Sequence, residues 1–258
     1  MNRTIVFGSI CILGGLALCG CQTCPAPTTA QAPAKPSVMT AKYTAEPVAV
    51  DGNLDDPVWV RATVYPLYLG DDADPAAGPI QEGGEVRLAW DKEFLYVGVR
   101  YFDSDIVAEG TEDQMLHFLQ GDVAEVFLKP AQNTWYWELY VTPHGKKSSL
   151  WFPGRGRMGL KSDEQYPMDL RVAAACQGTF GDWRDRDTSW TGEMAIPAAE
   201  LTKYGDAFGP GAAWSILVAR YNYSRYLTTR GAELTMTPKL PITSYHYHEG
   251  YATLELEQ

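Results

Sequence analysis

Residues 85–103 contain two segments in which apolar and polar side chains alternate, separated by a short polar turn at residues 91–93, and this pattern constrains the fold most. The apolar positions are Val86, Leu88, Trp90, Leu95, Val97, Val99 and Tyr101. A period of two places these side chains on one face of each strand and predicts a β-hairpin. A hairpin cannot bury its apolar face alone, so we expect further strands to form a second layer.

Composition excludes one large class of partner. The 258 residues carry a net charge of −11, with 32 acidic and 21 basic side chains. Binding to a phosphate backbone requires clustered Lys and Arg, so nucleic acid is not expected as a partner. The length fits one all-β sandwich domain, and the 8 Trp, 15 Tyr and 8 Phe suit a β-rich fold with aromatic binding surfaces.

The N-terminus predicts export and a lipid anchor. A basic start at Arg3 precedes an apolar run over residues 5–18, which is shorter than the ~20 residues of a membrane-spanning helix. Leu18-Cys19-Gly20-Cys21 resembles the bacterial lipobox, so we expect residues 1–20 to be a lipoprotein signal peptide and Cys21 to be lipidated. The alternative is an uncleaved membrane span. Gln22 after the lipidated cysteine favours the outer membrane of the bacterial envelope.

Residues 21–38 are rich in Pro and Ala and predict an unfolded tether, so the folded domain is expected at 39–258. Helical turns are expected around Trp59 and at 197–201, and long loops at 70–84 and 103–121. Cys176 ends an apolar strand and is expected to be a small buried hydrophobe rather than a disulfide partner of Cys24. Besides the hairpin, strands are predicted at 46–50, 123–129, 135–142, 150–152, 170–176, 189–196, 214–223 and 251–256.

Several of these segments together resemble the family 9 carbohydrate-binding modules (CBM9), which are DOMON-like β-sandwiches. The segments that carry the resemblance lie at 50–59, 86–97, 122–128, 190–197 and 254. They include the motifs Val50-Asp51-Gly52-Asn53-Leu54-Asp55 and Asp122-Val123-Ala124-Glu125-Val126-Phe127-Leu128. The resemblance implies an all-β, antiparallel β-sandwich of immunoglobulin- or jelly-roll-like architecture, with long loops and one or two short helical turns.

The resemblance also implies a sugar site. In sugar-binding members, two Trp rings clamp the chain end while a carboxylate, an Arg and amides bond its hydroxyls. Glu125 falls at the carboxylate position, Tyr245 at one clamp Trp and Tyr140 at the Arg. Leu119 falls at the other clamp position with Phe118 beside it, so the aromatic clamp is incomplete. The alternative for Glu125 is an outward charge on a strand.

Two further sets of residues could contribute to binding. Trp151, followed by Arg155 and Arg157, could form an aromatic platform for acidic sugars, or the arginines could simply be solvated loop residues. His246 and His248 are expected on one strand face, where they could bind a transition metal or line a pocket rim.

The sequence establishes no cofactor and leaves calcium open, because some members of the CBM9 family hold it in a loop. The candidate carboxylates are Asp51, Asp55, Asp56 and Asp103, although no EF-hand loop is present.

We expect an envelope-anchored, non-catalytic module that binds a poly- or oligosaccharide and supports carbohydrate catabolism beside O-glycosyl hydrolases. Neither Gly-x-Ser-x-Gly nor His-Glu-x-x-His occurs, and Asp122 and Glu125 point to opposite faces of a strand. One alternative is a sandwich that has lost its sugar site and docks other envelope proteins. Another is a haem-binding DOMON-like electron-transfer domain, with Met115, Met158, Met168 or a histidine as axial ligand.

Overall fold

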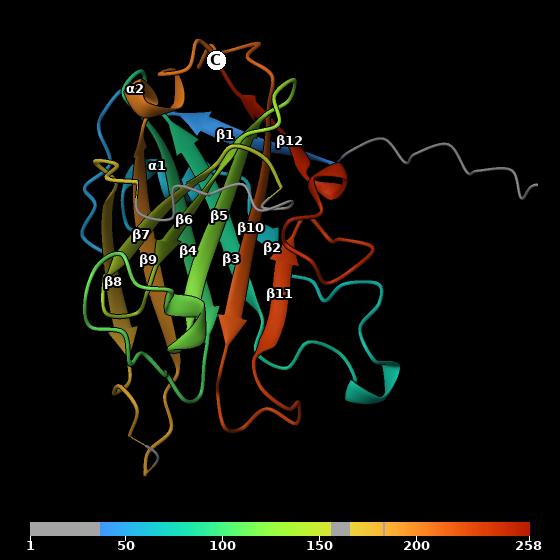
Figure 1. Ribbon diagram of the computed structural model, residues 1–258. Helices are drawn as coiled ribbons and strands as arrows, with labels where there is room; N and C mark the ends of the chain where they lie inside the picture. Colours follow the sequence, from blue (N-terminus) through green and yellow to red (C-terminus); the bar gives the residue numbers. More distant parts are fainter. Residues whose placement is uncertain (1–36, 156–165, 183) are drawn as a thin grey trace, which may run out of the picture. The chain divides into compact units, whose positions relative to one another are not determined.

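The predicted hairpin is present as β3 (Gly84–Trp90) and β4 (Phe94–Phe102), paired in register from Gly84 opposite Tyr101 to Trp90 opposite Leu95. The computed structural model describes residues 37–155, 166–182 and 184–258. The lipidation residue Cys21, Cys24 and the expected signal peptide lie outside this part of the chain. The described residues form twelve strands in two layers (Figure 1).

The other strands follow the predicted ones closely, with three additions. β5 (Val123–Pro130), β6 (Tyr136–Val141), β7 (Lys147–Phe152), β8 (Arg171–Gln177), β9 (Ser189–Pro197), β10 (Trp214–Asn222) and β12 (Ala252–Leu256) were all expected. The strands β1 (Val38–Tyr43), β2 (Tyr65–Pro66) and β11 (Glu233–Thr237) were not. The predicted strand at 46–50 is wrong, because this segment runs as extended chain without a sheet partner.

The helical segments are short turns in the connections between strands. They are α1 (Pro57–Arg61), α2 (Ala198–Leu201) and the 3-10 turns η1 (Pro75–Ala77), η2 (His117–Leu119) and η3 (His248–Gly250). Both α turns were predicted. Among the described residues no helix is long and apolar enough to span a bilayer.

One continuous hydrogen-bonded path links the two layers. The pocket sheet contains β7, β6, β5, β10 and β12 in that order, with β11 also beside β10. The hairpin sheet contains β3, β4, β9 and β8, with β2 beside β3. β1 joins them, because Val38–Ala41 pair with β12 and Lys42–Tyr43 pair with β3. Both pairings of β1 are parallel, whereas the remaining strand pairs are antiparallel, so the predicted antiparallel sandwich is confirmed apart from this corner strand.

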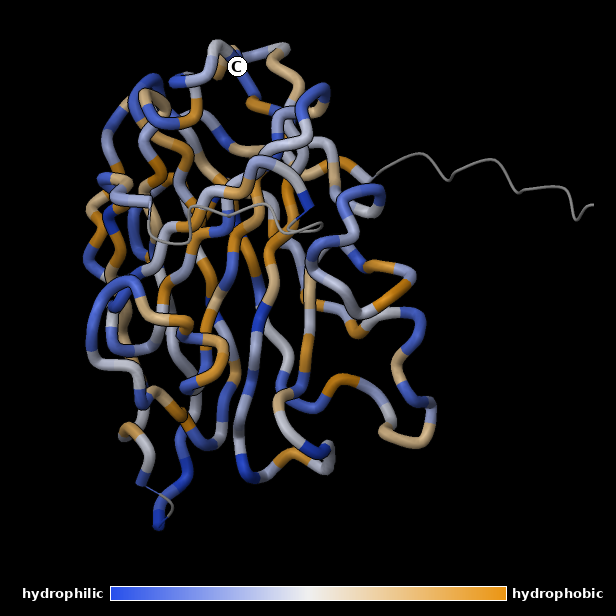
Figure 2. The backbone as a smooth tube through the Cα atoms, viewed as in Figure 1, coloured by the Kyte–Doolittle hydropathy of each residue, from blue (hydrophilic) through white to orange (hydrophobic). Residues whose placement is uncertain are grey.

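The main core lies between the sheets and takes alternate residues from each strand. Figure 2 shows apolar residues concentrated along the strands and polar residues along the loops. Leucine, valine and isoleucine dominate this layer, as in Val86, Leu88, Val97, Val99, Val126, Leu139 and Ile216, all fully buried. Cys176 is half-buried against this core, and its thiol lies 3.4 Å from the carbonyl oxygen of Pro143.

Both sheets are covered on their outer faces as well. Trp59 of α1 packs with Tyr96 and Ala195 on the outer face of the hairpin sheet, and its indole Nε1 donates to Glu193 at 2.8 Å. On the outer face of the pocket sheet, the segment before β5 and the segment between β11 and β12 cover β5, β6 and β10. This second covered face holds the candidate site.

Candidate functional site

A small pocket opens on the outer face of the pocket sheet, where β5, β10 and β11 lie side by side (Figure 1). Its volume is about 250 Å³. The sheet and two covering segments line it with Phe118, Glu125, Phe127, Glu138, Tyr221, Leu234, Thr243, Ser244, Tyr245 and His246. Strand alternation explains this, because residues 124, 126 and 128 enter the main core, and Glu125 and Phe127 must therefore face outward.

Two glutamates lie next to each other on the floor of this pocket. Glu125 pairs with Tyr140 across β5 and β6, and Phe127 pairs with Glu138, so the two carboxyl groups are diagonal neighbours on one face. Glu125 is 2% exposed and Glu138 is 5% exposed. We call Glu125 and Glu138 the carboxyl pair. Burial of two acids side by side requires that their charge be neutralised in some way.

Tyr140 supplies a hydrogen-bond donor to one member of the carboxyl pair. Its hydroxyl donates a short hydrogen bond to Oε1 of Glu138. Within the described part of the chain, Oε1 of Glu125 and Oε2 of Glu138 are buried and accept no hydrogen bond. The carboxyl pair on the pocket floor therefore contains two buried oxygen atoms that lack donors.

Burial shifts the pKa values of the carboxyl pair and of Tyr140. Desolvation raises the pKa of Glu125 well above its usual value; the charge of Glu138 raises it further, and the Tyr140 hydroxyl partly opposes the shift. Desolvation also raises the pKa of Glu138 to about 7. The pKa of Tyr140 is raised far beyond the neutral range by burial and by both glutamates, so its hydroxyl remains a donor.

Aromatic rings form the wall of the pocket. Phe118 of η2 lies 5.5 Å from the ring of Tyr221, and Tyr221 meets Tyr245 edge-on at 5.6 Å. Tyr245 is only 6% exposed, and its hydroxyl lies 2.9 Å from the carbonyl oxygen of Arg220. It is thus a fixed part of the wall rather than the open stacking platform that a clamp position implies. Phe118 and Tyr221 are half-buried and present their rings at the mouth.

The structure brings together most of the predicted site residues. Glu125, Tyr245 and Phe118 line one pocket, and Tyr140 lies beneath it. Trp151 does not join them. It pairs with Trp137, which points into the main core, and its ring packs against Trp135 and Tyr204 on the opposite face of the pocket sheet. A platform at Trp151 would belong to a different surface, and Arg157 lies outside the described residues.

Sequence analysis missed Glu138, Tyr221 and Phe127. The predicted strand at 135–142 places residue 138 on one face with Tyr136 and Tyr140, and that alternation was the available signal. The register that sets Glu138 beside Glu125 follows only from the β5–β6 pairing.

The two histidines are arranged differently from the prediction. Residues 245–247 form a turn that leads into η3, which begins at His248, so His246 and His248 do not share a strand face. Nδ1 of His246 lies 2.9 Å from the hydroxyl oxygen of Tyr136, and the His248 ring packs edge-on against the same tyrosine at 4.5 Å. Both imidazoles therefore serve to pack the covering loop onto β6.

The candidate metal and haem ligands are not gathered at one place. No group of three or more His, Cys, Asp or Glu that could hold a metal occurs among the described residues. Asp103 is paired with Arg220 at 2.9 Å, and Asp51 accepts the backbone N–H of Asn53. Met168 is buried in the main core, whereas Met158 lies outside the described residues.

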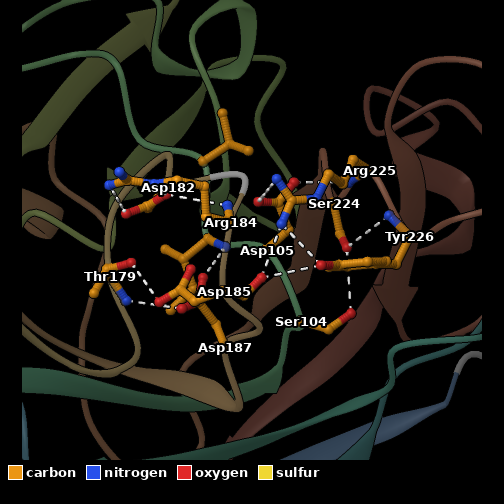
Figure 3. Close-up of polar contacts among 12 residues, drawn as sticks. Ser104, Asp105, Thr179, Asp182, Arg184, Asp185, Asp187, Ser224, Arg225 and Tyr226 are labelled. Carbon is orange, nitrogen blue, oxygen red and sulfur yellow. Dashed lines mark hydrogen bonds and ion pairs between the residues drawn. The ribbon is translucent and has the colours of Figure 1, made fainter.

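A second polar cluster ties three loops together at one end of the sandwich (Figure 3). Asp187 accepts the backbone N–H groups of Ile106 and Thr179, each at 2.7 Å. Asp105 accepts the backbone N–H of Arg225 at 2.9 Å. Because these carboxyl groups are already bonded to backbone donors, the cluster fixes loop conformation and contrasts with the unsatisfied carboxyl pair.

The same sandwich occurs in solved structures of low sequence identity. A candidate carbohydrate-binding protein from Bacteroides uniformis is 12% identical, with a TM-score of 0.67 over 86% of this chain and 100% of that chain. A family 9 carbohydrate-binding module from Caldicellulosiruptor kristjanssonii in complex with cellotriose is 13% identical, with a TM-score of 0.57 over 86% of this chain and 94% of that chain. The fold is CBM9-like.

A second structure of a C. kristjanssonii family 9 module, in complex with glucose, is 14% identical and has a TM-score of 0.57, over 86% of this chain and 96% of that chain. No protein-family model and no curated protein matches the sequence itself. The expected family resemblance is thus confirmed for the CBM9-like fold.

The raised pKa of Glu138 makes stability depend on pH. The folded protein keeps this proton up to about pH 7, whereas the unfolded chain releases it near the ordinary value of 4.5. Its contribution to stability is therefore complete below pH 4.5 and is lost as pH rises through 7. Between pH 5 and pH 8 we expect wild type to lose on the order of 2 kcal/mol more free energy of unfolding than Glu138→Gln.

Urea denaturation at pH 5 and pH 8 measures this difference. Glu255→Gln is the matched control, because it removes the same charge from an exposed position on β12 and should leave the pH dependence unchanged. An identical pH dependence in wild type and Glu138→Gln would contradict the buried acid described above.

Proposed function

We propose that the pocket binds a sugar and that the protein is a non-catalytic carbohydrate-binding module. The observation that carries the proposal is the combination of half-buried aromatic rings with unsatisfied buried carboxyl oxygens in one concave site. A pyranose has apolar C–H faces that pack on aromatic rings and a rim of hydroxyl donors for placed acceptors. Phe118 and Tyr221 offer the first contact, and the carboxyl pair offers the second.

The size of the pocket limits what it can hold. At about 250 Å³ it is smaller than the ~300–1,000 Å³ of sites that enclose drug-sized ligands, so it suits one sugar ring or a chain end. The incomplete aromatic clamp lowers the expected affinity. A single aromatic contact with a few hydrogen bonds gives about 4–6 kcal/mol net, or a Kd of roughly 1 mM to tens of µM.

The structural neighbours support this proposal. Family 9 modules with the same fold have been solved with cellotriose and with glucose. They support a poly- or oligosaccharide partner for this chain. We further propose a role accessory to carbohydrate-degrading enzymes. We infer that the chain has no hydrolytic activity of its own.

We also propose that Cys21 anchors the domain to the bacterial envelope, with the outer membrane favoured. The apolar run before Leu18-Cys19-Gly20-Cys21 and the Pro-rich segment behind it support this proposal. A tether of some 15 to 20 residues would hold the sugar site tens of ångströms from the membrane.

Truncation of the aromatic mouth tests sugar binding. Phe118→Ala removes a half-buried ring from the pocket and should weaken binding by about 1–2 kcal/mol, a five- to thirtyfold rise in Kd. Leu119→Ala is the matched control. Leu119 is next to Phe118 in the sequence, but its side chain is 65% exposed and does not line the pocket. Calorimetry or NMR titration of the full chain with glucans, xylans and mannans gives the Kd values.

The absence of any shift at millimolar sugar would overturn the binding proposal and favour docking to envelope proteins. Equal losses for Phe118→Ala and Leu119→Ala would move the site elsewhere. A Soret band after addition of haem to the purified protein would favour electron transfer instead.

Serine substitution tests the anchor. The Cys21→Ser variant should be lost from the membrane fraction. The Cys19→Ser variant should remain in that fraction, because only Cys21 is expected to be acylated. Mass spectrometry of mature wild type should find an acylated Cys21 at its N-terminus. An intact segment 1–20 on the mature protein would refute the assignment.

A further inference from the structure

We propose that the carboxyl pair makes this pocket selective for a sugar carrying a protonated amine, an amino sugar, over a neutral sugar of the same size. This inference rests on the proposed function and names the class of sugar that the same site prefers. It follows from the acceptor atoms, the charges and the rings that face the pocket.

The carboxyl pair contains buried oxygen atoms that have no hydrogen-bond donor among the described residues. These atoms are Oε1 of Glu125 and Oε2 of Glu138, and both glutamates line the site. A buried acceptor without a partner is destabilising, and a ligand donor can recover that loss. An ammonium group brings three N–H donors and no acceptor, whereas each sugar hydroxyl brings one donor and two lone pairs. An ammonium therefore matches a pair of carboxyl groups better than any single hydroxyl.

The charges facing the pocket point the same way. Among its described lining residues there is no Lys or Arg, and the acids are Glu125 and Glu138. Tyr221 and Tyr245 are neutral, because burial raises the pKa of both far above the neutral range. The charge of Glu138 opposes ionisation of Glu125. A bound cation would offset that repulsion and allow charge-assisted hydrogen bonds, which are stronger than neutral ones.

The aromatic wall suits a cation equally well. Phe118 and Tyr221 are half-buried and line the same pocket as the carboxyl pair, and the face of an aromatic ring attracts a cation electrostatically. A divalent metal is a poorer match. Calcium requires six to eight oxygen ligands, and the described residues contain no cluster of three metal-binding side chains.

Calorimetry with glucosamine, glucose and N-acetylglucosamine at pH 7 tests the inference on the full chain. We expect glucosamine to bind at least tenfold more tightly than glucose, and N-acetylglucosamine to show no such advantage, because acetylation removes the charge. Glu125→Gln and Glu138→Gln, each measured separately, should bring the ratio close to one. Glu255→Gln should keep the wild-type ratio, because its side chain is exposed on β12.

The pH dependence of the sugar preference can be measured on wild type alone, so this test does not depend on the variants folding. At pH 4 the carboxyl pair, which shares the pocket lining with His246, is protonated because burial raises the pKa of both glutamates, so the preference for glucosamine should disappear. Equal binding of all three sugars, or a preference retained by both Gln variants or at pH 4, would overturn the inference and leave sugar binding intact. Failure of all three sugars to bind would overturn both the inference and the proposed function.

Discussion

The guanidinium group of Arg220 lies fully buried between the two sheets, and it fixes their relation at one end of the sandwich. It donates to the carbonyl oxygens of Glu82 and Phe102 at 2.8 and 3.0 Å, and to Asp103 at 2.9 Å. A buried ion pair adds little net stability, but loss of one partner would strand a charge in the core. Because side chains alternate along a strand, an inward Arg220 obliges its neighbours Ala219 and Tyr221 to face outward. The position of Tyr221 in the pocket therefore depends on this interaction.

Burial of the pocket sheet on both faces explains the chemistry of the site. Glutamates on a strand that faced water would be ordinary solvated carboxylates. Here the segments around Phe118 and Tyr245 cover the outer face, so Glu125 and Glu138 lose most of their contact with solvent. Their raised pKa values and their unsatisfied oxygen atoms both follow from this cover.

Local sequence patterns predicted the strands well, because alternation is a property of neighbouring residues. The hairpin β3–β4, the strands β5 and β6 and the turn at Trp59 all follow from it. The family resemblance selected Glu125, which the structure places on the floor of a pocket rather than on an open surface. For Glu138, local alternation indicates only which strand face it shares, because its place beside Glu125 depends on the register between two strands.

The errors have the same origin. Tyr245-His246-Tyr247-His248 alternates like a strand, yet the segment is held as a loop by packing onto Tyr136 and Phe127. Trp151 looks exposed in sequence because a loop follows it, but cross-strand pairing with Trp137 turns it toward the other face. In both cases contacts between distant segments decide the outcome, and a single sequence does not encode them in a readable pattern.

The central claim is that the carboxyl pair on β5 and β6 contacts a bound sugar. Carbon-13 NMR of the glutamate side-chain carboxyl groups, assigned with the Gln variants and recorded with and without excess glucose, tests it most directly. The account predicts that the signals of Glu125 and Glu138 shift most, because no other glutamate lines the pocket among the described residues. Unchanged signals for these two, with shifts at residues outside the pocket, would contradict it.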